Sequence, residues 1–220
     1  MSRPRLLDLF CGAGGAAMGY HRAGFEVEGV DIEPHPDYPF PMIVADTMDI
    51  LADRGYLARF GVVHASPPCQ GWTTMANRAR GDWPKLIAPV RETLSEWGGL
   101  YVIENVPGAR ADMRSPLLLH GGMFGLKVDR PRLFESNAVL FGFTGPRTAN
   151  PIGVYGSLDG RRLWTRADGT EQRAARTLEQ AQQAMGIDWM EWDDLREAIP
   201  PAYTEFLGGQ LIDQLGERAA

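Results

Sequence analysis

The chain has 220 residues and a formal net charge of −6, with 44% hydrophobic and 23% charged residues. This composition is that of an ordinary globular protein and excludes a disordered or fibrous chain. At this length we expect one domain that buries a substantial core. The acidic balance argues against a protein that coats nucleic acid non-specifically, although residues 127–176 carry nine Lys or Arg against five Asp or Glu.

The sequence also bears on compartment and metal content. No apolar run approaches the roughly 20 residues of a membrane helix, and the first residues show no signal-peptide pattern. We therefore expect a cytoplasmic protein without membrane contact. The two cysteines, Cys11 and Cys69, do not make a disulfide framework, and the four histidines lack metal-ligand spacing. We expect free thiols and no metal.

The first half of the chain alternates short apolar runs with helical patterns. Runs rich in Val, Ile, Leu and Phe predict five buried strands, at residues 6–10, 25–31, 42–45, 62–65 and 100–104. Between the last two, apolar residues recur at three- and four-residue steps from Trp83 to Trp97, which predicts a helix ended by glycines. The alternation predicts a doubly wound α/β fold with a mostly parallel sheet and ligands beyond the carboxyl ends of its strands.

The second half is less regular. Residues 141–170 are rich in Gly, Pro, Thr, Asn and Arg without a period, and we interpret them as an irregular insertion. Helical patterns follow at residues 173–185 and 201–215.

A glycine-rich turn follows the first predicted strand. Residues 8–15 read Asp-Leu-Phe-Cys-Gly-Ala-Gly-Gly, and glycines at such a turn let a ligand approach the backbone closely. Gly12, Gly14 and Ala17 fit the dinucleotide fingerprint, with Asp31 as ribose acceptor. Taken alone, the turn is compatible with a nicotinamide-dependent oxidoreductase, and also with a tight turn that binds nothing.

A proline-rich loop carries the second cysteine. Ser66-Pro67-Pro68-Cys69-Gln70 follows a predicted buried strand directly, which places Cys69 at the carboxyl edge of the sheet. A lone cysteine is more often a small buried hydrophobic residue than a reactive group. The stiff proline turn favours a nucleophilic thiolate instead.

Charged residues follow the next predicted elements. Glu104 closes the strand at residues 100–104, so its carboxylate and the Cys69 thiol would point to the same sheet edge. That pairing suits nucleophilic attack assisted by a proton donor. Arg130 and Arg132 would share one face of an extended stretch, with a pair of surface arginines as the alternative.

Together these segments resemble the cytosine-C5 DNA methyltransferases, in that family's order and over nearly the whole chain. Residues 8–15 resemble its cofactor loop, and residues 66–70 its nucleophile loop. Glu104-Asn105-Val106 is similar to its Glu-Asn-Val motif, Arg130-Pro131-Arg132 to its Arg-x-Arg motif, and residues 197–202 to its last motif. The ordered set is highly specific and displaces the nicotinamide interpretation.

The resemblance implies the Rossmann-like fold of S-adenosylmethionine-dependent methyltransferases, with S-adenosylmethionine as cofactor. It implies a catalytic and cofactor-binding domain at residues 1–140, a reduced target-recognition insertion at 141–172 and C-terminal helices at 173–220. The implied catalytic residues are Cys69, Glu104, Arg130 and Arg132. The implied cofactor-binding residues are Phe10, Cys11, Gly12, Ala13, Gly14, Gly15, Asp31, Ile32, Asp46, Thr47, Pro68, Glu197 and Ala198.

The resemblance also implies individual roles on the cofactor. The glycine turn would line its methionine side, and Pro68 would touch it beside the nucleophile. Asp31 would accept from the ribose hydroxyls, while Ile32 would pack on the adenine and Asp46 would bond its amine.

On the substrate side, Cys69 would add to C6 of cytosine while Glu104 holds N3 and the two arginines support O2. The partner would be double-stranded DNA whose target cytosine is flipped out of the duplex, without an obligate protein partner. We expect a bacterial or phage-encoded enzyme. Methylation of RNA or of a free nucleotide is one alternative, and a catalytically inactive DNA-binding relative is another.

The chain departs from the family chiefly in size. Members normally insert a sizeable recognition domain before the last motif, whereas this chain has only the irregular residues 141–170 and a helix. Few base edges can be read by so little protein, so we expect a recognition site of about two to four base pairs or relaxed specificity. Arg147, Arg161, Arg162 and Arg166 suit phosphate contacts.

Overall fold

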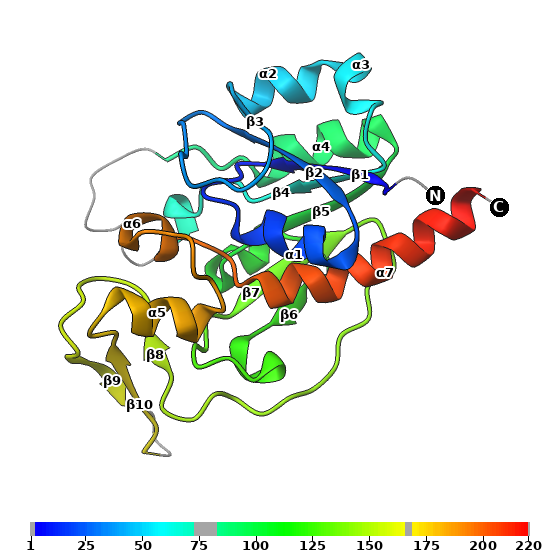
Figure 1. The fold of residues 1–220 in the computed structure, drawn as a ribbon. Helices are drawn as coiled ribbons and strands as arrows, with labels where there is room; N and C mark the ends of the chain where they lie inside the picture. Colours follow the sequence, from blue (N-terminus) through cyan, green and yellow to red (C-terminus); the bar gives the residue numbers. More distant parts are fainter. Residues whose placement is uncertain (1–2, 73–82, 166–168, 220) are drawn as a thin grey trace.

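The computed structural model describes residues 3–72, 83–165 and 169–219. They form a seven-stranded sheet covered by helices on both faces, with a small three-stranded sheet at one side (Figure 1). The predicted Arg166 lies outside the described residues.

The large sheet has the strand order β3-β2-β1-β4-β5-β7-β6. Its strands are β1 (Arg5–Leu9), β2 (Glu26–Asp31), β3 (Met42–Val44), β4 (Val62–Ala65), β5 (Leu100–Asn105), β6 (Leu117–Leu119) and β7 (Arg132–Ser136). Strands β1 to β5 are parallel, while β7 runs antiparallel to both β5 and β6. This confirms the predicted doubly wound, mostly parallel α/β fold, and the five predicted strands are all present.

Helices cover the two faces of this sheet (Figure 1). One face carries α1 (Gly15–Ala23) and α7 (Pro201–Ala219), and the other carries α2 (Thr47–Ala52), α3 (Arg54–Leu57) and α4 (Ile87–Trp97). Alternate residues of β1 explain the two cores, because Leu6 packs in the cluster of the first face and Leu7 in that of the second. Within the described part of the chain, no helix has both the length and the apolar character needed to cross a bilayer.

The contact between α1 and α7 brings the end of the chain back to the glycine turn. A Cβ added to Gly19 would lie 2.0 Å from Oγ1 of Thr204, so only glycine allows the two helices to approach this closely. The Thr204 hydroxyl donates to the carbonyl of Ala16 at 2.8 Å. The C-terminal segment is therefore held against the start of α1.

The strand order reverses between β1 and β4, which are neighbours in the sheet although β2 and β3 separate them in the chain. Loops leaving such neighbours diverge and open a crevice at their carboxyl ends. The glycine turn leaves β1 there and the proline-rich loop leaves β4. Three short 3₁₀ helices follow later strands or loops, η1 (Gln70–Trp72), η2 (Pro107–Asp112) and η3 (Gly121–Phe124).

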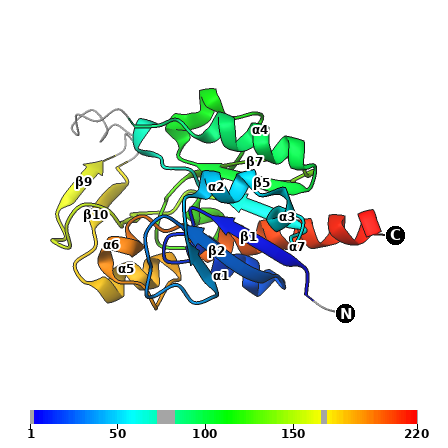
Figure 2. The same ribbon diagram turned by 90° about the horizontal axis from the view of Figure 1, so that it is seen from above.

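A small module lies at the end of the molecule opposite the C-terminus (Figures 1 and 2). It consists of β8 (Ile152–Gly153), β9 (Arg162–Thr165), β10 (Glu171–Ala174), α5 (Leu178–Met185) and α6 (Trp192–Leu195). Its apolar residues share a cluster with Ala13 of the glycine turn and with Val128. The module is thereby packed against the crevice.

Three expectations about element boundaries were wrong. The helix predicted from residue 173 begins only at Leu178, because Arg173 pairs with β8 and β9 and Thr177 caps the helix by accepting from the N–H of Gln180. The residues interpreted as an irregular insertion contain β8 and β9 of the small sheet, and β10 follows them. These strands of two to four residues are too short to show a period. The helix predicted from Trp83 begins at Ile87, and Trp83 is exposed.

Candidate active site

A cavity of about 630 Å³ opens at the carboxyl ends of the parallel strands. Of the residues that the sequence nominated, Gly14 and Arg130 do not line it. The nominated residues that do line it are Phe10, Cys11, Gly12, Ala13, Gly15, Asp31, Ile32, Asp46, Thr47, Pro68, Cys69, Glu104, Arg132, Glu197 and Ala198. Segments from β1, β2, β4, β5 and the C-terminal region therefore converge on one cavity.

The glycine turn forms one wall of the cavity with bare backbone. Gly12 has a φ of 48°, and a Cβ added there would meet no atom within 4 Å, so this backbone faces open space. A Cβ on Gly15 would lie 2.4 Å from the carbonyl oxygen of Ile199, so the turn packs closely against residues 197–202, the C-terminal motif. Gly14 has a φ of 87° and packs against Tyr38, which explains its glycine without a place in the cavity wall.

Acidic groups mark the β2 side of the cavity. Asp31, the last residue of β2, accepts a hydrogen bond from the N–H of Gly12 at 3.0 Å through Oδ2. Asp46 caps α2 by accepting from the N–H of Met48 at 2.8 Å, so it is a helix cap as well as a cavity residue. Ile32 is 67% exposed and adds an apolar surface to the cavity lining.

Cys69 is half-buried on the loop after β4. Asn105 holds this loop to β5, because its Nδ2 donates to the carbonyl of Pro67 at 2.9 Å. Burial and the nearby Glu104 raise the pKa of the Cys69 thiol, while Arg132 opposes this shift. The thiol is thus positioned in the cavity, in surroundings that disfavour the thiolate.

Glu104 projects from β5 and is 5% exposed. Its Oε1 lies 3.0 Å from Nε of Arg132, the first residue of β7. Burial raises the pKa of the Glu104 carboxyl, and the charges of Arg132 and Arg130 counteract that rise. A buried carboxyl that keeps a proton more readily than usual is suited to proton donation near neutral pH.

Arg130 differs from the sequence expectation. Its φ of 35° lies in the left-handed region, so the chain is not extended there and the two arginines do not share a face. Its guanidinium donates to three carbonyls, those of Ala198 at 2.7 Å, Val154 at 3.1 Å and Arg196 at 2.6 Å. Arg130 therefore joins the small module to the C-terminal motif, while Arg132 faces the cavity.

Further cavity residues escaped the sequence analysis. Asp8 is fully buried in β1, and neither of its oxygens makes a hydrogen bond of normal geometry among the described residues. Burial and the neighbouring Asp31 raise its pKa. A carboxylate inside an otherwise apolar predicted strand could have marked Asp8 as a site residue in the sequence. Tyr155, His35 and Asp194 also line the cavity, but no local pattern marked them.

His35 connects two walls of this cavity. Its Nδ1 lies 3.1 Å from Oδ1 of Asp194 in α6, and its Nε2 lies 3.8 Å from Oδ2 of Asp31. The C-terminal region is thus joined to the end of β2 across residues far apart in the sequence.

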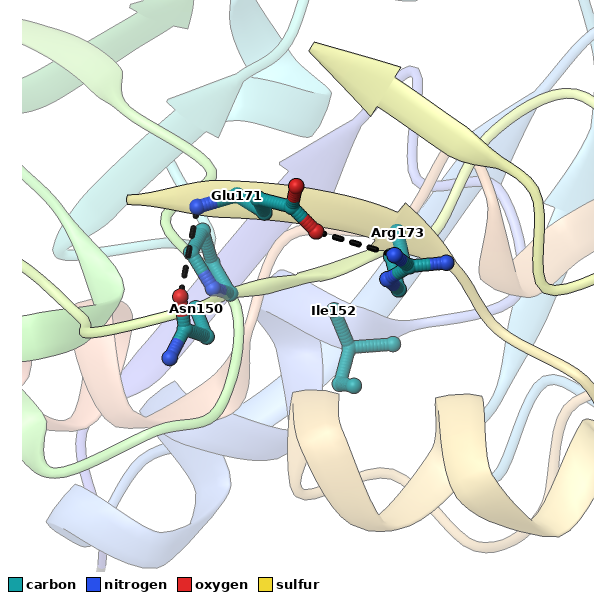
Figure 3. A pocket seen from close by; sticks show the side chains of 5 residues that line it. Asn150, Ile152, Glu171 and Arg173 are labelled. Atoms are coloured by element: carbon teal, nitrogen blue, oxygen red, sulfur yellow. Dashed lines mark hydrogen bonds and ion pairs between the residues drawn. The ribbon is translucent and has the colours of Figure 1, made fainter. Parts of the chain in front are cut away.

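A second, smaller hollow of about 350 Å³ lies on the small module. Figure 3 shows Glu171 on β10 between Asn150 and Arg173. The N–H of Glu171 donates to Oδ1 of Asn150 at 3.2 Å, and Nη2 of Arg173 donates to Oε2 of Glu171 at 2.9 Å. The charged side chains that line this hollow, Glu171 and Arg173, are paired with each other. Its lining therefore offers no convergent set of reactive side chains.

Comparison with known proteins relates the chain to methyltransferases, although no family model matches it. It is 25% identical over 249 residues to the type II methyltransferase M.XorII of Xanthomonas oryzae pv. oryzae, which covers 97% of this chain and 55% of that protein. It is 27% identical over 179 residues to the type II methyltransferase M.AgeI of Thalassovita gelatinovora, covering 72% and 41%. The chain thus spans about half the length of these relatives.

Solved structures share the fold. A candidate DNA modification methyltransferase encoded within an E. coli prophage superposes with a TM-score of 0.65 at 14% identity, covering 97% of this chain and 99% of that one. The S. pombe Dnmt2 methyltransferase superposes with a TM-score of 0.60 at 13% identity, covering 97% and 99%. The fold is the Rossmann-like fold of S-adenosylmethionine-dependent methyltransferases, and the sequence similarity is to type II methyltransferases.

Proposed function

We propose that this chain transfers a methyl group from S-adenosylmethionine to C5 of cytosine in double-stranded DNA, with Cys69 as covalent nucleophile. One observation carries the proposal: Cys69, Glu104 and Arg132 line the same cavity as the glycine turn after β1. A thiol, a buried proton donor and a cation are the groups that addition to a cytosine ring needs.

The methyltransferase relatives imply S-adenosylmethionine as cofactor, and the cavity fits it. Asp8 is a buried carboxyl group without a hydrogen-bonded partner of normal geometry in the described residues, and a cationic ligand would favour its ionised form. The bare backbone at Gly12 accommodates close approach. Asp31 would bind the ribose, and Ile32 would cover the adenine. When bound, the cofactor supplies an electrophilic methyl group carried on a sulfonium.

The protein residues act on the cytosine. The Cys69 thiolate bonds to C6 while Glu104 places a proton on N3, and the ring electrons then make C5 nucleophilic. Arg132 supports O2 and holds the Glu104 carboxylate at 3.0 Å. After C5 gains its methyl group, the C5 proton leaves to water and the N3 proton returns to Glu104, which lets the bond between C6 and Sγ break. The thiolate is released and the ring is again aromatic.

The electrostatics of the cavity favour this order of events. An ionised Glu104 raises the pKa of Cys69, so the thiolate is disfavoured as long as Glu104 carries its negative charge. When Glu104 takes up a proton from solvent and shares it with N3 of the base, that repulsion falls and Arg132 is left to stabilise the thiolate. Substrate binding and activation of the nucleophile are thereby coupled.

The small module would contribute the contacts to DNA. Tyr155 lines the cavity, is 39% exposed and lies two residues after the end of β8. Its ring is available for stacking on a base that has been flipped into the cavity. Arg161 and Arg162 are exposed and pair with Asp159 and Glu171 at 3.5 Å and 3.4 Å. Exposed ion pairs are weak, so these arginines can exchange their partners for phosphates.

The proposal is tested by following tritiated methyl groups from S-adenosylmethionine into duplex DNA, RNA and dCMP. We expect label in duplex DNA. Label confined to RNA or dCMP would contradict the substrate assignment, and label in adenine after hydrolysis of the DNA would contradict the C5 chemistry.

Covalent catalysis is tested with duplex DNA that contains 5-fluorocytosine, which blocks loss of the C5 proton. The wild-type protein should form a denaturation-resistant complex with this DNA in the presence of cofactor, and Cys69→Ser should not. Unsubstituted duplex of the same sequence is the matched control. Trapping that survives Cys69→Ser would overturn the role of this thiol.

The short recognition site is tested by bisulfite sequencing of randomised duplex DNA after treatment with the protein. The small module reads few base edges, so we expect two to four defined positions. A site of six defined positions would contradict this part of the proposal.

A further inference from the structure

A chain of buried polar side chains leads from α1 to the cavity. Tyr20 and His64 are both fully buried, and the Tyr20 hydroxyl lies 3.0 Å from Nδ1 of His64. Nε2 of His64 lies 2.9 Å from Oγ of Ser66, which follows β4 and lines the cavity. Ser66 in turn interacts through its side chain with Glu104 and lowers the pKa of that carboxyl.

The protonation of His64 determines which atom donates and which accepts in each of these hydrogen bonds. Burial lowers the pKa of His64 to about 3, so its ring is neutral and carries one proton. Among the described residues, the Tyr20 hydroxyl has His64 as its hydrogen-bond partner. If Nδ1 carried the proton, the hydroxyl hydrogen of Tyr20 would be buried without an acceptor, which is unfavourable. Tyr20 therefore donates to Nδ1.

The remaining steps follow from this first one. With Nδ1 as acceptor, the single ring proton lies on Nε2 and is donated to Oγ of Ser66. The Ser66 hydroxyl accepts from His64, so its own hydrogen is directed to the neighbouring acceptor, Glu104. The bonds from Tyr20 to His64 and from His64 to Ser66 point the same way, and each donor polarises the next.

We propose that Tyr20 and His64 are positioning residues that hold the Ser66 hydroxyl as a directed donor to Glu104. The inference deepens the proposed function, because it assigns two buried residues to the control of the proton that Glu104 places on cytosine N3. Neither residue contacts the cavity itself; each acts through Ser66.

Several other charged groups face Glu104. Arg132 and Arg130 favour its ionised form, whereas Asp8 and Cys69 lie near enough for like charges to disfavour it. Ser66 adds a neutral donor that favours the carboxylate without adding charge to the cavity. The carboxyl can then give up its proton to N3 and take it back during one reaction cycle, which a group raised only by burial would do less readily.

The first experiment reads the hydrogen-bond direction in the free protein. Long-range ¹H–¹⁵N NMR of the histidine rings should show His64 as the neutral tautomer protonated on Nε2, unchanged down to about pH 4 as expected for a buried ring. In Tyr20→Phe the preference between tautomers should weaken. His64 protonated on Nδ1 in the wild-type protein would overturn the proposal.

The second experiment measures the titration of Glu104 by carboxyl ¹³C NMR, again without cofactor or DNA. Ser66→Ala should move its pKa upwards, because the ionised form loses a donor. Tyr20→Phe should move it in the same direction by less. Tyr101→Phe is the matched control, since it removes another buried tyrosine hydroxyl, bonded to Ser95 and packed in the core of the opposite sheet face. Identical titrations in wild type and Ser66→Ala would overturn the proposal.

The third experiment follows methyl transfer against pH. If protonated Glu104 is required, activity falls as pH rises through its pKa, and this limb should move to higher pH in Ser66→Ala and less so in Tyr20→Phe. A fall in activity at every pH without movement of the limb indicates a merely structural role and contradicts the inference. A wild-type protein without methyl transfer would refute the proposed function, whereas the two NMR experiments would still decide the direction of the chain.

Discussion

The sheet edge and the small module form two walls of one cavity, and they are held together in different ways. At the sheet edge the polar groups are buried and contact one another in fixed geometry, as Glu104 does with Arg132. On the small module the charged pairs are exposed, as between Arg162 and Glu171. Buried pairs resist rearrangement, while exposed pairs exchange partners with little cost. Under the proposed function, the chemistry depends on the rigid sheet edge, and contact with a nucleic acid depends on the adaptable small module.

The largest expected effect comes from the nucleophile on the rigid wall. Replacement of Cys69 by alanine should lower methyl transfer on the order of 10⁴-fold or more, because covalent activation of the ring is lost. Calorimetric titration should show that cofactor binding is retained. Turnover within tenfold of wild type would contradict the assignment of the covalent chemistry to Cys69 at the sheet edge.

The next largest effect concerns the stability of the sheet. Arg91 of α4 and Glu135 of β7 form a buried ion pair in which Nη2 and Oε2 lie 2.7 Å apart, and Arg91 also donates to the carbonyl of Asp112. Glu135→Ala leaves Arg91 buried without its carboxylate and should lower the free energy of unfolding by about 3–5 kcal/mol. Urea denaturation measures this change.

The small module supplies the control for that measurement. Glu171→Ala removes the exposed partner of both Arg162 and Arg173, and the urea midpoint should stay at its wild-type value. An equal loss of stability in the two variants would show that the walls do not differ as described.

Arg130 joins the two walls, and its replacement should have an intermediate effect. A lysine cannot reach three carbonyls from one ammonium group, so Arg130→Lys should cost about 1–3 kcal/mol of stability and weaken cofactor binding through the displaced C-terminal motif. Arg147→Lys keeps a cation beside the buried Asp129 carboxylate from an exposed position, so it is the matched control and should change neither quantity. Equal behaviour of the two variants would contradict the joining role.

A smaller effect is expected at Tyr155. Loss of a stacking ring costs about 1–3 kcal/mol per base, so Tyr155→Ala should lower kcat/KM for DNA about tenfold or somewhat more. Tyr155→Phe keeps the ring and loses the hydrogen bond to Gln172, and it should retain most activity. Cofactor affinity, measured without DNA, should be unchanged in both. A weakened cofactor affinity would place Tyr155 on the cofactor side instead.

The smallest effect should appear at the exposed arginines. Arg161→Ala and Arg162→Ala should each weaken DNA binding a few-fold at low salt and reduce the slope of log K against log[salt] by about one. Fluorescence anisotropy over a range of salt concentrations measures both. An unchanged slope would contradict the prediction that these arginines contact DNA phosphates.

The sequence alone predicted the elements that depend on local pattern. Apolar runs indicated the five parallel strands, and the glycine and proline turns indicated the two loops at the edge of the sheet. Most of the nominated residues line one cavity, because parallel strands bring their carboxyl ends to the same side. The strands of the small module were missed, since two to four residues cannot display a period.

Only the tertiary structure decided which side chains meet. Strand order places β1 beside β4 although β2 and β3 lie between them in the chain, and this brings Asp8 opposite His64. The backbone turn at Arg130 directs its guanidinium to the carbonyls of the small module and the C-terminal motif rather than to the cavity. Local patterns determine what each segment is, whereas long-range packing determines what it touches, because contacts across the sheet join residues with no relation in sequence spacing.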